Sequence, residues 1–280
     1  MPAYKLLALD VDGTLMGRDG VVRARTAAAV ARAAAAGIQP VVCTGRRYRR
    51  ALPVARQLGI AAPVVCNSGA LVKDTGSHAT LWRADLGREL TTAVLEVLRR
   101  LGEPAVSIVD HEETPPDFLI PARPTGRALF DDYVERNGPY ALVDPHWMTR
   151  PDQGDHFHLF AVGERAAMLE VEAALIEAAP GILRTFVLHT SAYSGTMCEV
   201  LNTEASKWSA VLHLAERWGI DPSEIVAVGD DVNDLPMIEG AGLGVAMGQA
   251  PEAVRRAADL VAPTFEQDGV ASLIEEVLLA

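Results

Sequence analysis

KLLALDVDGTL, residues 5–15, is an apolar run that stops at two carboxylates, Asp10 and Asp12, and continues at once into Gly13. An apolar run this short is typical of a buried strand in a parallel sheet, where ligands bind at the carboxyl ends of the strands. Gly13 lets the backbone turn tightly enough for both acids to face one bound group. Two carboxylates this close repel each other unless a cation lies between them, and Mg²⁺ held by oxygen ligands fits that need. The alternative is an ordinary strand that ends in an Asp-Gly turn, and three further motifs decide against it.

The length and charge of the chain limit its class. Its 280 residues suit about two domains at roughly 150 residues each. Hydrophobic residues make up 49% of the chain, enough to fill two cores. The formal net charge of −12 argues against nucleic acid and anionic membrane surfaces as partners, because both favour a basic protein face. A small anionic substrate is compatible with this charge, because local residues decide its binding.

The early apolar stretch does not resemble a signal peptide, because two aspartates interrupt it, and no apolar run approaches the roughly 20 residues that span a bilayer. We therefore expect a cytoplasmic protein without a membrane partner. The three cysteines, Cys43, Cys66 and Cys198, are odd in number, far apart and set among apolar neighbours. This pattern predicts buried, reduced thiols and no disulfide framework.

Strand and helix patterns alternate at both ends of the chain. After the first strand, the patterns predict a helix over 22–36, a strand over 38–43, a helix ending at 58 and a strand over 62–66. This order with short connections predicts an α/β fold, a doubly wound parallel sheet with a Rossmann-like core. The last third resumes the alternation, with a helix over 206–218 and strands over 225–228 and 243–246.

The middle of the chain lacks the regular alternation of strand and helix patterns, and we expect it to form an inserted α/β cap domain. Its predicted elements are helices near 89–101, 127–136 and 164–178, strands near 105–109, 157–162, 183–188 and 197–201, and an exposed Pro-rich connection over 114–124. We therefore predict a catalytic core from 1–83 and 202–280, and a cap domain from 84–201.

Three further motifs carry polar groups at element ends. Thr44 and Gly45 follow the second strand and precede a helix, where backbone N–H groups attract phosphate. Lys207 begins a predicted helix, where a cation opposes the helix dipole unless an anion neutralises it. Residues 229–234, GDDVND, place a carboxylate directly after a buried strand. A surface lysine and an acidic turn are each common alone. These motifs therefore indicate a functional site only in combination with the Asp10 motif.

In order and spacing these motifs resemble those of the haloacid dehalogenase superfamily, in its branch of class II capped (Cof-like) phosphatases. The matches are DVDGTL at 10–15, TGR at 44–46, Lys207, GDDVND at 229–234, and the lesser signatures NSGA at 67–70, VAMG at 245–248 and DGVA at 268–271. Gln249 departs from the asparagine that is usual in the branch, and no catalytic consequence is expected.

The resemblance implies a Mg²⁺-dependent phosphatase that works through an aspartyl-phosphate. Asp10 would attack phosphorus, and Asp12 would protonate the leaving oxygen and then activate water. The carboxylates of Asp10 and Asp230 and the backbone carbonyl of Asp12 would bind Mg²⁺. Thr44 and Lys207 would complete the catalytic set. The implied phosphate-binding residues are Val11, Thr44, Gly45, Arg46, Lys207 and Asn233, and the supporting residues are Asn67 and Asp234.

The implied substrate is a small phosphate ester, such as a sugar phosphate, a nucleotide-related phosphate or a phosphorylated cofactor. Asp12 favours a phosphatase, because ion-pumping ATPases of the superfamily lack an acid there and keep their aspartyl-phosphate long-lived. Candidate cap contacts to the leaving group are His111, Glu112, Tyr193 and Met197. His156 and His158 lack a third metal ligand of fitting spacing and are expected to be strand-surface or cap-core residues.

Two alternative hypotheses use the same residues. Residues 43–49 have the Cys-x5-Arg spacing of cysteine phosphatases, but Arg46, Arg47 and Tyr48 crowd a loop that needs small residues. The Asp, Thr and Lys set also resembles a receiver module that accepts a phosphoryl group as a signal. A receiver would not need the large insertion, and Mg²⁺-dependent turnover of small phosphate esters would separate the two.

Overall fold

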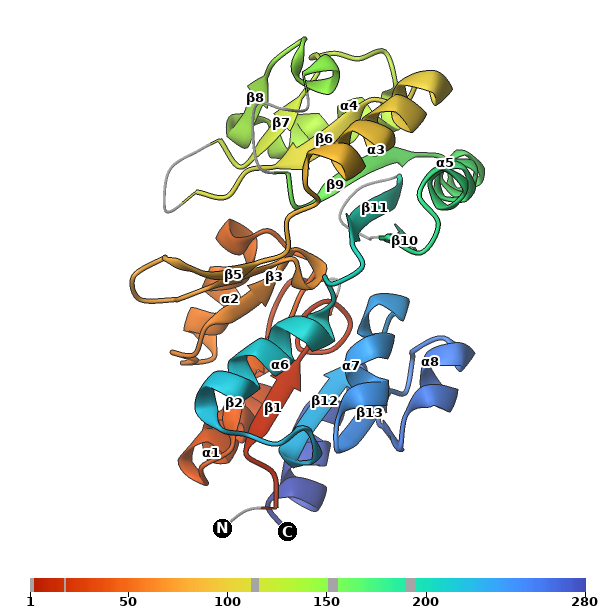
Figure 1. The fold of residues 1–280 in the computed structure, drawn as a ribbon. Helices are drawn as coiled ribbons and strands as arrows, with labels where there is room; N and C mark the ends of the chain where they lie inside the picture. Colours follow the sequence, from red (N-terminus) through yellow and green to blue (C-terminus); the bar gives the residue numbers. More distant parts are fainter. Residues whose placement is uncertain (1–2, 18, 112–115, 151–155, 190–194) are drawn as a thin grey trace. The chain divides into compact units, whose positions relative to one another are not determined.

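The computed structural model describes residues 3–17, 19–111, 116–150, 156–189 and 195–280 (Figure 1). The chain divides into two compact units. Unit 1 comprises Met1–Trp82 and Ser206–Ala280, and unit 2 comprises Arg83–Ala205. Within the described ranges, no helix combines the length and the apolar character needed to span a membrane.

Unit 1 is built on a parallel sheet of five strands in the order β14-β13-β12-β1-β2. The strands are β1 (Leu6–Leu9), β2 (Gln39–Val42), β12 (Ile225–Gly229), β13 (Leu243–Met247) and β14 (Leu260–Ala262). β1 pairs with β12 on one side and with β2 on the other, so that Ala8 lies opposite both Ala227 and Val41. All four residues of β1 are buried, as expected for a parallel strand covered on both faces.

Helices cover both faces of this sheet. They are α1 (Ala24–Ala35), α2 (Tyr48–Gln57), α6 (Lys207–Trp218), α7 (Leu235–Gly240), α8 (Glu252–Ala257) and α9 (Gly269–Leu273). α6 packs against α7, while α1 packs against α9, and Figure 1 shows α6 and α7 in front of the sheet. The doubly wound α/β fold predicted from the sequence is confirmed, and it places the carboxyl ends of β1, β2 and β12 at one edge.

The strand predicted over 62–66 differs from expectation in its partners. β3 (Val64–Cys66) pairs antiparallel with β4 (Leu71–Lys73), in a small sheet that also contains β5 (Thr80–Arg83). Its link to the parallel sheet is the isolated bridge between Cys43 and Val65. The reason is a reversal of the chain at Asn67–Gly69, whose φ angles of 53°, 54° and 92° are all left-handed and return the chain along β3.

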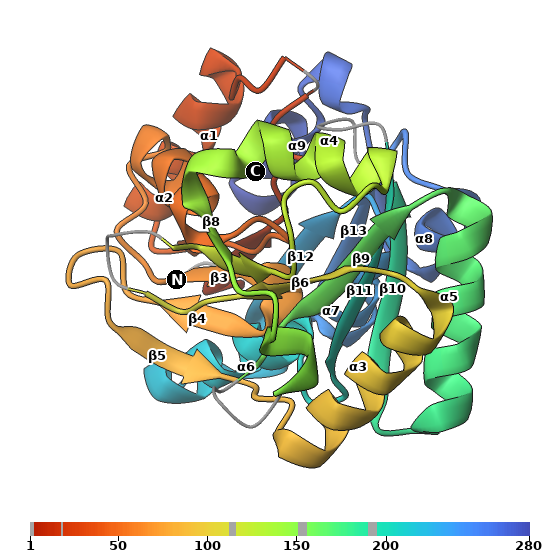
Figure 2. The same ribbon diagram turned by 90° about the horizontal axis from the view of Figure 1, so that it is seen from above.

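Unit 2 contains a sheet of six strands in the order β10-β11-β9-β6-β7-β8. The strands are β6 (Ala105–Ile108), β7 (Phe118–Ile120), β8 (Ala141–Val143), β9 (Leu159–Gly163), β10 (Leu183–His189) and β11 (Thr196–Asn202). The helices are α3 (Arg88–Leu101), α4 (Ala128–Asn137) and α5 (Arg165–Ala178). Figure 2 shows α3 and α5 side by side along this sheet, and they pack against each other.

The two faces of this sheet are covered by different helices. Leu159 and Ala161 belong to the apolar cluster that includes α3 and α5. Phe160 points to the other face, because side chains alternate along a strand, and there it contacts Tyr133 of α4 edge to face. The exposed connection predicted over 114–124 is wrong for β7, since Phe118 and Ile120 are buried. The short run Phe-Leu-Ile is strand-forming in spite of the prolines around it.

Candidate active site

Asp10 and Lys207 meet at the carboxyl edge of the parallel sheet. Asp10 directly follows β1, and its backbone N–H donates to the carbonyl of Val228 at 3.0 Å. Lys207 is the first residue of α6, and its Nζ donates to Oδ1 of Asp10 at 2.6 Å. Nζ also donates to Oδ1 of Asp234 at 2.5 Å and to Oδ1 of Asn233 at 3.3 Å. These three bonds use all three N–H donors of the ammonium group.

The position of Lys207 follows from how α6 begins. Ser206 and Ser209 form a capping box, in which each side chain accepts the backbone N–H of the other residue. This cap fixes the helix start, so that Lys207 occupies the first turn with its side chain 1% exposed. Burial alone lowers the pKa of Lys207, but the charges of Asp10 and Asp234 outweigh that effect and raise it above its ordinary value. The anions expected from the helix-dipole argument are therefore these two carboxylates.

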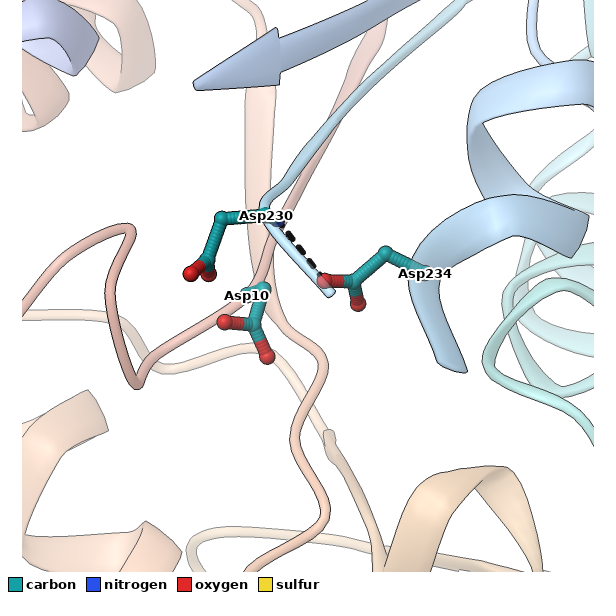
Figure 3. Close-up of side chains that lie close together, drawn as sticks. All are labelled: Asp10, Asp230 and Asp234. Carbon is teal, nitrogen blue, oxygen red and sulfur yellow. Dashed lines mark hydrogen bonds between the residues drawn. The ribbon is translucent and has the colours of Figure 1, made fainter. Parts of the chain in front are cut away.

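Asp234 organises the acidic loop that follows β12. Its Oδ2 accepts the backbone N–H groups of Asp230 and Asp231 at 2.9 and 3.0 Å, and Figure 3 shows the first of these bonds. Its Oδ1 accepts from Lys207. Both oxygens of Asp234 are therefore occupied by the protein itself. Asp231 is half-buried, and its side chain accepts the backbone N–H of Val232.

The carboxylates of Asp10, Asp230 and Asp234 form a cluster that can hold a metal ion, with oxygens within 4.8 Å of one another (Figure 3). Both oxygens of Asp234 already accept hydrogen bonds, so the oxygens that could bind such an ion are those of Asp10 and Asp230. Thr14 donates its hydroxyl to Oδ1 of Asp230 at 3.0 Å, which fixes the orientation of that carboxylate. Gly13 lies against the same group, since a Cβ there would stand 2.1 Å from Oδ2 of Asp230. Carboxylate oxygens of this kind fit Mg²⁺.

The charge balance of the cluster also favours a cation. Three carboxylates, Asp10, Asp230 and Asp234, face one ammonium group, that of Lys207. Burial raises the pKa of Asp10 well above its ordinary value, and the charge of Asp234 adds to the rise. Burial and the charge of Asp234 also raise the pKa of Asp230 to about 7. A divalent cation would compensate the excess negative charge.

The side chain of Asp12 is outside this cluster of carboxylates and pairs with Arg46. The Nε and Nη2 atoms of Arg46 donate to the two carboxylate oxygens of Asp12 at 2.7 and 2.6 Å. The Asp12 side chain is 60% exposed and that of Arg46 is 26% exposed. Arg46, which the sequence suggests as a phosphate ligand, thus holds the residue expected to be the acid–base group.

Thr44, Gly45 and Asn67 form neighbouring loops beside the sheet edge. The Thr44 hydroxyl oxygen accepts the backbone N–H of Arg46 at 3.1 Å, so its own proton can still be donated. The backbone N–H groups of Asn67 and Ser68 donate to the carbonyls of Arg46 and Thr44 at 3.0 and 3.1 Å. The left-handed turn at 67–69 therefore holds the loop that contains Thr44 and Gly45.

Val11 is buried, and its carbonyl accepts the backbone N–H of Met16 at 2.8 Å, which shapes the loop after Asp10. Two residues that contact this loop were not expected from the sequence. Thr14 orients Asp230, and Gln249 donates its amide to the carbonyl of Gly13 at 2.5 Å. Thr14 stands inside the DGT motif, which was a usable signal, whereas Gln249 stood out only as a departure from the usual asparagine.

Cys43 and the candidate residues of unit 2 each have defined partners or surroundings. Cys43 is buried, and burial raises the pKa of its thiol far above the ordinary range, which disfavours a thiolate. His111 pairs with Asp117 at 2.8 Å, and Met197 lies in β11. Glu112 and Tyr193 lie outside the described residues.

His156 and His158 are core residues of unit 2, with 6% and 2% of their surfaces exposed. His156 Nδ1 and the hydroxyl of Ser107 are 2.7 Å apart. Burial lowers the pKa of His158 to about 3, so its imidazole is neutral.

Residues 7–274 match the model of the haloacid dehalogenase-like hydrolase family. The protein YxeH of Bacillus subtilis (strain 168) is 30% identical, with 99% of each chain covered. The pyridoxal phosphate phosphatase YbhA of Escherichia coli (strain K12) is 27% identical, with 98% of this chain and 99% of that protein covered. A solved haloacid dehalogenase-like hydrolase from B. subtilis has a TM-score of 0.79 and 25% identity, covering 98% of this chain and 100% of its own.

Proposed function

Because the chain belongs to the haloacid dehalogenase-like hydrolase family, in its Cof-like phosphatase branch, we propose that it is a Mg²⁺-dependent phosphatase. It hydrolyses a small phosphorylated metabolite through an aspartyl-phosphate on Asp10. The observation that carries this proposal is the 2.6 Å contact between Lys207 and Asp10, at a sheet edge that Asp230 also reaches. A carboxylate oriented by a buried cation is suited to attack phosphorus, since phosphoryl transfer needs positioning and charge neutralisation.

The metal ion has a defined donor set in this proposal. Asp10, Asp230 and the backbone carbonyl of Asp12 would hold Mg²⁺, which supplies positive charge that neutralises the transferring phosphoryl group. Thr14 and Gly13 support Asp230 from one side, through the hydroxyl contact and the close approach of the glycine. Asp234 stays outside the donor set because Lys207 and two backbone N–H groups occupy its oxygens.

The protein groups around Asp10 have separate tasks. Asp10 attacks phosphorus with the oxygen that Lys207 does not bind. Thr44 donates its remaining hydroxyl proton to a phosphoryl oxygen, and the backbone N–H groups of Val11 and Gly45 donate beside it. Lys207 reaches the phosphoryl group by giving up the longest of its three bonds, the 3.3 Å bond to Asn233. Asn233 is then released to contact the same group.

Asp12 completes the cycle as the acid–base residue. It protonates the leaving oxygen when Asp10 attacks, and it then takes a proton from the water that hydrolyses the aspartyl-phosphate. Its side chain is 60% exposed, so that it can reach a leaving group from the solvent side of the sheet edge. Asn67 acts indirectly, because its backbone N–H holds the carbonyl of Arg46.

The relatives and the division of the chain support a substrate class. A phosphorylated cofactor or a sugar phosphate is the preferred class, and the similarity to a pyridoxal phosphate phosphatase supports it. All proposed phosphoryl-group residues come from unit 1, so residues 84–201 are free to act as a cap domain that selects the leaving group. A cytoplasmic location belongs to the same proposal, and the three buried thiols of Cys43, Cys66 and Cys198 are compatible with it.

A phosphate-release screen tests this function. The panel contains sugar phosphates, nucleoside monophosphates, pyridoxal phosphate and an aryl phosphate, each assayed with Mg²⁺ and with a chelator. We expect multiple turnovers of at least one small ester with Mg²⁺ and none with the chelator. A single phosphorylation of the protein without turnover would instead support a receiver, and chelator-resistant turnover would contradict the metal assignment.

A further inference from the structure

The side chains of Asp12 and Arg46 form a two-bond ion pair. Nη2 of Arg46 lies 2.6 Å from Oδ1 of Asp12, and Nε lies 2.7 Å from Oδ2. We infer that Arg46 exchanges partners: it binds Asp12 in the substrate-free enzyme and the phosphoryl group in the complex, which releases Asp12 for acid–base catalysis. This partner exchange rests on the proposed function. It adds that Arg46 binds the phosphoryl group before Asp12 becomes available for acid–base catalysis.

The pair as it stands keeps Asp12 from its proposed task. An acid–base carboxylate needs an oxygen within hydrogen-bond reach of the leaving group or of the attacking water. Both oxygens of Asp12 instead accept N–H groups of one guanidinium, whose fork geometry holds them in a single plane. Asp12 can therefore act only after at least one of these two bonds opens.

The exposure of the two side chains makes this opening easy. The Asp12 side chain is 60% exposed and that of Arg46 is 26% exposed, so water replaces each lost bond. Ion pairs that water reaches are weaker than buried ones, because the solvent screens their charges. The neighbouring pair of Lys207 and Asp10 differs, because its side chains are only 1% and 7% exposed. Of the two ion pairs, the one with Arg46 is the one that yields.

The main chain of Arg46 is fixed where a phosphoryl group is proposed to bind. Its N–H donates to the hydroxyl oxygen of Thr44 at 3.1 Å, and its carbonyl accepts from the N–H of Asn67 at 3.0 Å. Only the side chain has to move for the exchange. A guanidinium fork matches two phosphoryl oxygens as well as two carboxylate oxygens, and a phosphoryl dianion carries more charge than Asp12.

The exchange makes and breaks hydrogen bonds only. Two N–H donors pass from Asp12 to phosphoryl oxygens, and water solvates the freed carboxyl group. The proton that Asp12 later gives to the leaving oxygen comes from the solvent. Asp12 and the phosphoryl group thus compete for one guanidinium. Removal of Asp12 should therefore strengthen phosphate binding, and this gain should depend on Arg46, because coupling between two sites is measured by such a difference.

A double-mutant cycle measures this coupling without any turnover. Calorimetric titration with inorganic phosphate in the presence of Mg²⁺ is applied to the wild type, Asp12→Ala, Arg46→Ala and the double variant. We expect Asp12→Ala to lower the Kd for phosphate by about two- to fivefold, the range set by an exposed ion pair. In the Arg46→Ala background the same change should leave the Kd unaltered. Arg47→Ala is the matched control, since it removes a neighbouring positive charge and should leave the effect of Asp12→Ala intact.

Thermal unfolding of each variant verifies that it is folded. If Asp12→Ala lowered the Kd for phosphate equally with and without Arg46, the cause would be the removal of a negative charge near the phosphate. That result would overturn the partner exchange. No tightening in either background would overturn it as well. Turnover of phosphate esters by the wild type distinguishes these outcomes from failure of the proposed function, because an enzyme that neither binds phosphate nor hydrolyses any ester refutes both.

Discussion

The Nζ atom of Lys207 lies 2.6 Å from Oδ1 of Asp10, although 197 positions separate the two residues in the sequence. The contact joins the two segments of unit 1, one at the end of β1 and the other at the start of α6. A second carboxylate, that of Asp234, lies 2.5 Å from the same nitrogen. One buried cation therefore orients the proposed nucleophile and the loop that carries the proposed metal ligand Asp230.

Replacement of Lys207 tests how much this contact contributes to the stability of the protein. In Lys207→Met, Asp10 and Asp234 lose their shared cation inside the protein, and an unpaired buried charge is strongly destabilising. We expect the free energy of unfolding, measured by urea denaturation without Mg²⁺ at neutral pH, to fall by about 3–5 kcal/mol. A loss below about 1 kcal/mol, the range of an exposed pair, would contradict the geometry.

Paired substitutions separate the two candidate nucleophiles. Asp10→Asn should abolish Mg²⁺-dependent phosphate release, because an amide neither attacks phosphorus nor supplies an anionic metal ligand. Cys43→Ser should keep most of kcat, since Cys43 is buried and burial raises the pKa of its thiol. Near-normal turnover by Asp10→Asn would refute the assignment, and an inactive but folded Cys43→Ser protein would revive the cysteine hypothesis.

The affinity for Mg²⁺ should rise with pH. Burial and neighbouring acids raise the pKa of Asp10, and they raise the pKa of Asp230 to about 7. Protons and Mg²⁺ therefore compete, and metal binding releases protons below that pH. The folded pKa values lie above the unfolded ones, so the metal-free protein binds more protons than the unfolded chain. Its free energy of unfolding therefore falls as the pH rises from the ordinary aspartate value of 3.8 to about 7.

Calorimetric titration with Mg²⁺ in two buffers of different ionisation enthalpy measures this proton release. We expect release at about pH 6 and much less at about pH 8, on either side of the pKa of Asp230. A Kd for Mg²⁺ that does not change between these pH values would show that neither carboxylate is a ligand.

Gly13 should matter for the metal site as well as for the turn. Its φ is 90°, and a Cβ there would stand 2.1 Å from Oδ2 of Asp230. Gly13→Ala should therefore displace Asp230 and weaken Mg²⁺ binding by about tenfold or more, the effect of disturbing groups that support a metal ligand. Gly20 is the matched control, because its φ is 71° and, among the described residues, no atom lies within 4 Å of where its Cβ would stand.

Gly20→Ala should destabilise the protein through backbone strain alone. We expect its free energy of unfolding to fall by about 1 kcal/mol, which lowers the melting temperature, while the Kd for Mg²⁺ stays unchanged. Equal Kd values in Gly13→Ala and Gly20→Ala would show that contact with Asp230 has no part in metal binding.

The sequence predicted the parallel core because its signals are local. A short apolar run before Asp10 and another before Asp230 specify buried strands, and the alternation with helices specifies their winding. The parallel bridge of β3 to the chain beside β2 agrees with the prediction, but its antiparallel pairing with β4 was not predicted, because that pairing depends on the left-handed turn at 67–69. Asn and Ser at these positions gave no pattern that distinguishes such a turn from the start of a helix.

The grouping of Asp10, Lys207 and Asp234 was foreseen from the motifs, whereas the pairing of Asp12 with Arg46 was not. Asp10 directly follows β1, while the start of α6 and the loop after β12 lie at the same edge of the sheet, so the order of strands brings Asp10, Lys207 and Asp234 together. Asp12 and Arg46 carry side chains on loops, and their contact depends on rotamers that spacing does not encode. For the same reason the bond from Gln249 to Gly13 could not be read from the sequence.

The most direct measurement of the central claim is detection of a phosphoryl group on Asp10. Asp12→Asn is mixed with Mg²⁺ and a p-nitrophenyl phosphate substrate, whose good leaving group needs little acid catalysis, and the reaction is quenched in acid. Because the asparagine cannot activate water, the aspartyl-phosphate should accumulate, and mass spectrometry of the peptide that contains Asp10 should show one added phosphoryl group. The same quench with Asp10→Asn should show none. A peptide that stays unmodified in Asp12→Asn while p-nitrophenol is released, or a phosphoryl group on Cys43, would contradict the account.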